Sequence, residues 1–89
     1  MKYKFAPSSS YIRAHKTFIK RHPELRQKLK GQLELLQNNP HHSLLKTHEL
    51  SGNLKGLQAC SLTHKYRIVF KKEEDVIYLL NIGTHDEVY

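Results

Sequence analysis

The feature that most constrains the fold is a run of apolar and β-branched residues at positions 76–82, which stops at Gly83. A run of this kind predicts a strand that is buried on both faces. Glycine ends it because glycine accepts backbone angles that other residues resist. The remaining residues place His85, two carboxylates and Tyr89 directly beyond the strand. We therefore expect the rest of the chain to build a sheet that holds these side chains beside a basic surface.

Two amphipathic segments before this strand predict a helix hairpin. Polar and apolar residues alternate over positions 2–5, which predicts a first strand, and the serines at 8–10 offer helix N-caps. Apolar residues then recur at helical spacing as far as His22, where the following Pro23 disfavours the α conformation. Pro23 suits the first turn of a second helix. The apolar stripe of that helix consists of Leu25, Leu29, Leu33 and Leu36.

The second half of the chain predicts a three-stranded antiparallel meander after a loop at 41–54. Its parts are a strand at about 56–62, a strand at 66–70, a charged turn at 71–75 and the strand at 76–82. The element order is therefore β-α-α-β-β-β, and the 89 residues suit one domain, 1–89. This order predicts an α+β fold with an antiparallel sheet, the helix hairpin packed on one face and the other face open.

Positive charge is concentrated in the predicted helices. The formal net charge is +7, and residues 1–48 hold ten Lys and Arg against two acids, whereas residues 49–89 hold five against six. Such a bias indicates an anionic partner, either nucleic acid or an acidic protein, although a solvated helix surface also accounts for it. The candidate residues for binding a nucleic acid are Lys16, Lys20, Arg21, Arg26, Lys28, Lys30 and Lys65.

The single cysteine and the absence of long apolar runs indicate the compartment. Cys60 has no partner for an internal disulfide, which favours the reducing cytoplasm. No apolar run reaches the roughly 18 residues of a membrane span or the core of a signal peptide. We therefore expect a cytoplasmic protein, complete as written, without a membrane segment.

Histidine and arginine supply the candidate chemistry. Two of the seven histidines, His48 and His85, lie next to glycine-containing turns at the ends of the expected sheet. Histidine exchanges protons near neutral pH, so the two can act as acid and base, or they can be ordinary hydrogen-bonding turn residues. Arg67 interrupts an apolar strand, where it can pair with Asp86 or Glu87 or bind a phosphate. The histidine spacings match no zinc pattern, so no metal is expected.

These residues together resemble the RelE/ParE toxin superfamily, and most closely its YafQ-like branch of messenger-RNA interferases. The resemblance covers the whole chain and is carried by the element order, the spacing of His48, Gly52 and Gly56, the strand at 66–70 and the ending Gly83-Thr84-His85 followed by Tyr89. It implies a toxin of a bacterial type II toxin–antitoxin system that cleaves messenger RNA on the ribosome without a metal or cofactor. It also implies an acidic antitoxin as the partner.

The resemblance carries catalytic roles to four residues. His48 and His85 match the two histidines of the YafQ-like pattern, Tyr89 its terminal aromatic residue, and Arg67 the strand arginine of the RelE-like pattern. Three positions depart from that pattern, since relatives can carry another histidine, an aspartate and an arginine where this chain has Ser61, Lys65 and Asn81. His64 lies near the first of these positions, but its odd offset predicts the wrong side of a strand.

Two other functions stay open at this point. ParE-like members of the same superfamily inhibit a topoisomerase and do not cut RNA, and the fold alone does not separate the two activities. The second alternative is a decayed toxin that only binds its antitoxin. The pair His48 and His85 together with Arg67 favours the RNA interferase, because inhibition of a topoisomerase requires no acid and base.

Overall fold

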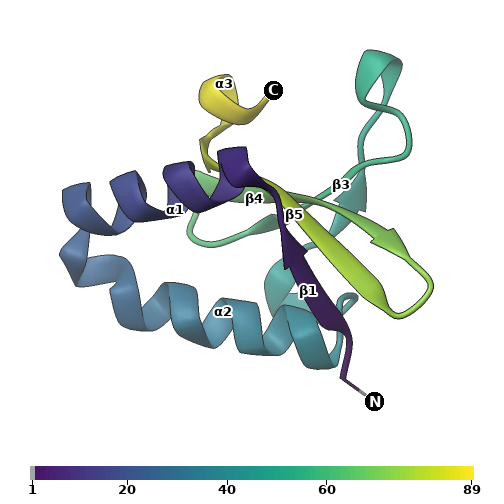
Figure 1. The fold of residues 1–89 in the computed structure, drawn as a ribbon, viewed down its shortest axis with the longest axis horizontal. Coiled ribbons are helices and arrows are strands. Elements are labelled where there is room, and N and C mark those ends of the chain that lie inside the picture. The colour runs from purple at the N-terminus through teal and green to yellow at the C-terminus, as the bar shows by residue number, and fades with distance from the viewer. Residues whose placement is uncertain (1) are drawn as a thin grey trace.

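The computed structural model describes residues 2–89, and one five-stranded sheet organises them (Figure 1). The strand order is β1-β5-β4-β3-β2. The bounds are β1 Lys4–Pro7, β2 His48–Glu49, β3 Gln58–Ser61, β4 Tyr66–Glu73 and β5 Val76–Thr84. The meander β3-β4-β5 is antiparallel as predicted, but β1 pairs with β5 in parallel, so the expectation of a purely antiparallel sheet is wrong. Local alternation encodes a strand but not the direction of its distant partner.

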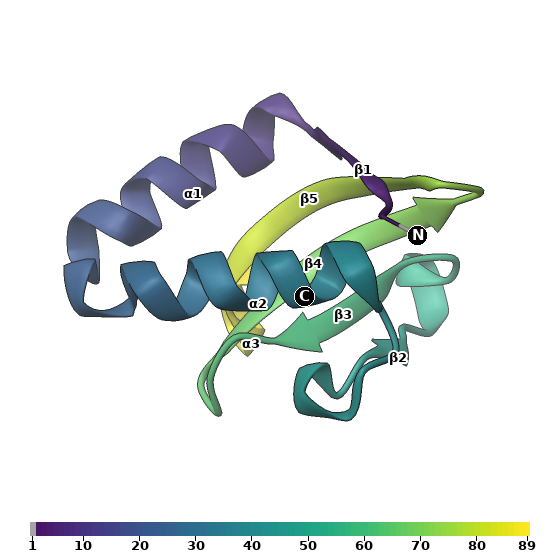
Figure 2. The same ribbon diagram turned by 90° about the horizontal axis from the view of Figure 1, so that it is seen from below.

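The predicted helix hairpin is confirmed. Helix α1 spans Ser9–Arg21, a short 3-10 turn, η1, spans Pro23–Leu25, and α2 spans Arg26–Asn38. The Ser8 hydroxyl caps α1 by accepting a hydrogen bond from the Tyr11 backbone N–H at 3.0 Å. Figure 2 shows α2 lying across one face of the sheet and α1 diverging from it after their shared end.

The core lies between this helix pair and the sheet. Buried residues of the helices pack against Cys60 of β3, Ile68 and Phe70 of β4 and the apolar side of β5. The helical contributions are Tyr11, Phe18, Leu29 and Leu36. The opposite side of β5 is less covered than its composition predicts, because Tyr78 is 38% exposed. Helices cover only one face of the sheet at this position, so the predicted burial of this strand on both faces is wrong there.

The segment between α2 and β3 is more structured than the predicted loop. It contains the 3-10 turns η2 (Ser43–Leu45) and η3 (Gly52–Leu54), with β2 between them. A strand of two residues is too short to show a period, which is why the sequence did not reveal it. The turn between β4 and β5 is also tighter than expected, and Glu74 adopts a left-handed conformation with φ 52°.

The chain ends in a one-turn helix, α3 (His85–Val88), which the sequence analysis did not predict. Thr84 is its N-cap, and Glu87 completes a capping box. The signal was present in the sequence as Thr84 followed three residues later by Glu87. Figure 1 shows α3 and the η3 turn on the side of the sheet away from α2.

No helix within residues 2–89 is long and apolar enough to cross a membrane.

Candidate active site

The register of the sheet divides β3, β4 and β5 into two sets of side chains. Cys60, Ile68 and Ile82 form one row, which packs under the helix pair. The adjacent row consists of Ser61, Arg67 and Gly83, and side chains of neighbouring rows point to opposite faces. We call the side that carries this second row the α3 face. Arg67 therefore lies away from the helix pair, as the alternation predicted.

The α3 face is not the open surface that the sequence predicted. Ala59 and Val69, the next row on this face, are almost fully buried. Helix α3 packs against β4 and β5 there. Because part of the face is covered, the accessible side chains are confined to its margins and to the row of Arg67.

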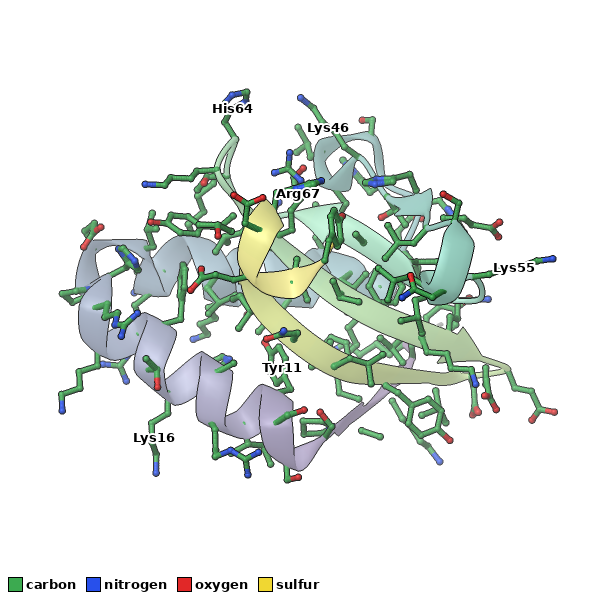
Figure 3. All side chains as sticks on the ribbon, turned by 90° about the horizontal axis from the view of Figure 1, so that it is seen from above. Tyr11, Lys16, Lys46, Lys55, His64 and Arg67 are labelled. Atoms are coloured by element: carbon green, nitrogen blue, oxygen red, sulfur yellow. The ribbon has the colours of Figure 1, made fainter. Side chains whose placement is uncertain are left out.

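Arg67 bonds to the loop that precedes its own strand. Its Nη1 donates hydrogen bonds to the carbonyl oxygens of Thr63 and His64, both at 3.0 Å. Within residues 2–89 no ion pair joins Arg67 to Asp86 or Glu87, so the pairing considered from sequence is wrong. The carbonyl contacts fix the guanidinium while its charge stays unneutralised. Figure 3 shows Arg67 beside α3.

His85 and Tyr89 face each other across the single turn of α3. Their ring centroids lie 4.3 Å apart at an interplanar angle of 83°, and the Tyr89 backbone N–H donates to the His85 carbonyl at 3.1 Å. The pKa of Tyr89 is raised by partial burial, while the positive charge of Arg67 acts to lower it. The charge of Arg67 therefore acts on Tyr89, and the C-terminal turn brings His85 and Tyr89 into contact.

His48 lies on the opposite margin of the α3 face. It pairs with Ala59, which the register places on the same face as Val69 and Arg67. Its Nδ1 lies 3.3 Å from the carbonyl oxygen of Lys46. A carbonyl can only accept, so this contact requires a proton on Nδ1 and leaves Nε2 of the neutral ring free to accept one.

The structure does not bring the two histidines into contact. Three strand spacings of about 4.8 Å separate β2, which carries His48, from β5, which leads into His85, so these two strands lie about 14 Å apart. Arg67, on β4, lies between them in the strand order. In strand order His48 therefore comes first and His85 last with Arg67 between, although the register places His48 level with Val69 rather than with Arg67.

Lys46 is a contributor to this site that the sequence analysis missed. It adopts a left-handed conformation with φ 50°, which turns its carbonyl toward His48. Figure 3 shows its side chain pointing outward at the edge of the molecule. No sequence signal marks this residue, because lysine is not a typical residue for that conformation.

The positions that depart from the YafQ-like pattern have different surroundings. Ser61 shares the row of Arg67 on the α3 face. The Asn81 side chain accepts a hydrogen bond from the Ile82 backbone N–H at 2.9 Å. The Lys65 ammonium lies 5.6 Å from the centre of the Tyr66 ring, which packs on Phe18 of α1. His64 lies in the loop before β4 rather than in a strand, and its side chain is exposed.

The predicted RNA-binding cations of the helices are all exposed, but they do not form one surface with the histidines. Lys16, Arg26 and Lys30 line a groove of about 940 Å³ between α1 and α2. Figure 3 shows Lys16 pointing away from the sheet on the outer side of α1. Arg21 instead borders a smaller hollow next to α3.

The described part of the chain, residues 2–89, contains no group of three histidine, cysteine or acidic residues arranged to hold a metal ion.

The model of the YafQ family, a bacterial toxin of type II toxin–antitoxin systems, matches residues 3–89. The chain belongs to the YafQ toxin family. The resemblance drawn from the spacing of His48, the strand of Arg67 and the C-terminal ending is therefore confirmed at the level of the family. A search of curated proteins gave no match.

Solved structures of the YafQ family share the fold over the whole chain. A crystal structure of a YafQ mutant from E. coli is 26% identical, with 99% of both chains covered and a TM-score of 0.85. The E. coli DinJ-YafQ toxin–antitoxin complex matches at 25% identity, covering 100% of this chain and 99% of that one, with a TM-score of 0.83. A YoeB/ParE toxin from Agrobacterium tumefaciens is 15% identical, covers 92% of this chain and 98% of its own, and has a TM-score of 0.78, which shows the fold alone.

Proposed function

We propose that this YafQ-family toxin is a metal-independent endoribonuclease that cleaves messenger RNA on the ribosome and so inhibits translation. The observation that carries the proposal is the position of Arg67 on the α3 face, between the strand of His48 and the helix of His85 and Tyr89. Such an activity places the protein in the cytoplasm, where its ribosomal substrate is.

The order of His48, Arg67 and His85 across the sheet suits an in-line displacement at phosphorus. A base removes the proton of the 2′-hydroxyl as the 2′-oxygen bonds to phosphorus, and an acid protonates the 5′-oxygen as its bond to phosphorus breaks. These two oxygens lie on opposite sides of the phosphorus, so two histidines that flank a cation without touching fit the requirement. Arg67 stabilises the negative charge that develops on the phosphoryl oxygens.

The contacts of each histidine suggest its role. His48 is held with its proton on Nδ1 by the Lys46 carbonyl, which leaves Nε2 as the base. His85, whose helix lies on the other side of Arg67 in the strand order, is then left for the role of the acid. Tyr89 is 38% exposed and offers a face for stacking on an unpaired base.

Primer extension on a translated messenger RNA tests the proposal. Wild-type protein should produce cuts within codons only when ribosomes translate the message. The His48→Gln variant should lose the cuts. Intact message together with an inhibited topoisomerase in a supercoiling assay would overturn the proposal in favour of a ParE-like activity.

The antitoxin partner belongs to the same proposal. The groove between α1 and α2 is lined by apolar side chains such as Ile12, which is 52% exposed, and is bordered by Lys16, Arg26 and Lys30. An apolar floor with basic borders is complementary to an amphipathic helix whose polar side is acidic. We propose that such a helix of the antitoxin occupies the groove.

Ile12 provides the test of this docking surface. The Ile12→Asp variant should bind the antitoxin at least tenfold more weakly in calorimetric titration, because it puts a negative charge on the apolar floor. Its cleavage of translated message should equal that of the wild type, since Ile12 lies far from the α3 face. Unchanged antitoxin affinity would show that the antitoxin docks elsewhere.

A further inference from the structure

Helix α3 needs outside support to hold a fixed orientation. It has a single turn, whereas isolated helices shorter than about 12 residues are marginal in water. It nevertheless begins at one candidate catalytic residue, His85, and is followed directly by another, Tyr89. Their placement must therefore come from contacts between α3 and the rest of the chain.

The Glu87 side chain supplies the contact at the start of the helix. Its Oε1 accepts a hydrogen bond from the Thr84 backbone N–H at 2.8 Å, and its own backbone N–H donates to Thr84 Oγ1 at 3.3 Å. These two bonds satisfy N–H groups that have no partner within a helix. They also tie the turn to Thr84, the last residue of β5.

Gly83 lets this side chain approach the strand closely. A Cβ atom at position 83 would lie 2.9 Å from Glu87 Oε1 and 3.1 Å from Glu87 Cβ, which is tighter than packed atoms tolerate. The backbone of Gly83 is not in the left-handed region, so close approach rather than backbone freedom requires glycine here. Gly83 lies opposite Arg67 on β4, so the contact is made on the α3 face.

The end of α1 lies across a hollow from the same carboxylate. A hollow of about 370 Å³ separates α1 from α3, and its lining includes Arg21, His22, Gly83 and Glu87. The pKa of Glu87 is lowered by the hydrogen bonds from Thr84 and further by the charges of Arg21 and His22. Glu87 therefore contacts the end of β5 directly, and within residues 2–89 no ion pair joins it to Arg21 or His22 across the hollow.

We propose that Glu87 and Gly83 are positioning residues, which lock α3 onto the end of β5 and thereby fix His85 and Tyr89 relative to Arg67. Glu87 does this through its hydrogen bond to Thr84, and Gly83 by leaving room for it. The effect on catalysis rests on the proposed function, whereas the lock itself does not.

Nuclear magnetic resonance on the full chain tests the lock without RNA. In the wild type, the His85 and Tyr89 rings should show a nuclear Overhauser contact, and the Tyr89 amide should be protected from exchange. Glu87→Ala should lose both signals, while Glu87→Gln should keep them because its amide oxygen still accepts from Thr84. Glu34→Ala, which removes an exposed carboxylate of α2, is the matched control and should behave as the wild type.

A double substitution separates the two roles. Gly83→Ala alone should displace α3 because its methyl group collides with Glu87. Adding Gly83→Ala to Glu87→Ala should cause a smaller further loss than Gly83→Ala alone, since the contact with Oε1 is gone and only the 3.1 Å contact with the Cβ atom of residue 87 remains. Retention of the ring contact in Glu87→Ala would overturn the proposal. Loss of the contact in both Glu87→Ala and Glu87→Gln would also overturn it, because charge rather than the hydrogen bond would then hold the helix.

Cleavage assays then test the catalytic consequence. Glu87→Ala should lower the single-turnover cleavage rate about 10–100-fold, as misplacement of reacting groups by about 1 Å does, with Glu87→Gln restoring most of it. Ribosome affinity should not change. A wild-type protein that cuts no message would overturn the proposed function but leave the spectroscopic result valid. An unaltered rate in a Glu87→Ala variant that has lost the ring contact would overturn the positioning role.

Discussion

The two faces of the sheet use the same three strands for different purposes. Under the helix pair, Ile68, Phe70 and Ile77 are completely buried among apolar side chains. On the α3 face, the intervening positions hold Arg67 and Gly83, and the exposed residues His48 and His85 lie at the margins. Stability is therefore concentrated on one face and candidate chemistry on the other, so substitutions on the two faces should have separable effects.

The largest expected effect is on activity, from His85→Ala. Loss of one positioned acid or base costs about 10²–10⁴-fold in rate. The His85 side chain is 70% exposed, and a substitution at such a surface position changes the free energy of unfolding by no more than about 0.5 kcal/mol. Primer extension and a thermal melt on the same purified variant measure the two quantities.

Antitoxin titration serves as the control for this variant, because His85 lies outside the groove between α1 and α2. Binding should be unchanged. An active His85→Ala protein, or one whose activity and melting temperature fall together, would remove His85 from the catalytic set and weaken the separation of the two faces.

Phe70→Ala should have the converse effect. The Phe70 side chain is fully buried in the core, and its truncation should lower the free energy of unfolding by about 3–5 kcal/mol through lost burial and the cavity left behind. Urea denaturation measures the change. The cleavage rate per folded molecule, determined at a temperature where the variant is still folded, should stay close to that of the wild type. A catalytic loss of 100-fold in folded protein would mean that the two faces are coupled.

Arg67→Lys tests whether the α3 face needs the guanidinium group of Arg67 or only its positive charge. Lysine keeps the charge but loses the planar fork that donates to the carbonyls of Thr63 and His64. A hydrogen bond that involves a charged group contributes about 1.5–3 kcal/mol, so we expect a fall of about tenfold or more in cleavage rate. Single-turnover kinetics on ribosome complexes measure it. Full activity of the lysine variant would show that charge alone suffices at this position.

The smallest expected effect is the difference in thiol reactivity between the native Cys60 and a cysteine introduced at position 61. Burial raises the pKa of Cys60 to about 12, so at pH 8.5 it should be almost entirely protonated and inert. A cysteine at the next position, introduced as Ser61→Cys in a Cys60→Ala chain, lies on the α3 face and should react with a maleimide much faster. Mass spectrometry of timed samples compares the two. Equal rates would contradict the assignment of the two residues to opposite faces.

Much of the fold could be predicted from local patterns. Periodicity and caps gave both helices and the three strands of the meander, and the C-terminal half carried the family resemblance that the match to residues 3–89 confirms. The structural features that the sequence did not predict have physical causes. Strand β2 is too short to show a period, and the parallel pairing of β1 depends on a partner more than 70 residues away. The capping box of α3, formed by Thr84 and Glu87, has a recognisable sequence pattern, but the sequence analysis did not use it.

For the candidate site, the sequence by itself determined which side chains are present and that Arg67 alternates away from the core. The period of a strand is two, so residue type and position alone assign its face. Only the tertiary structure decided that His48 and His85 lie at opposite margins, that the Lys46 carbonyl lies 3.3 Å from His48 Nδ1, and that Glu87 packs on Gly83. These features arise where segments distant along the chain meet, and their geometry depends on the whole packed sheet.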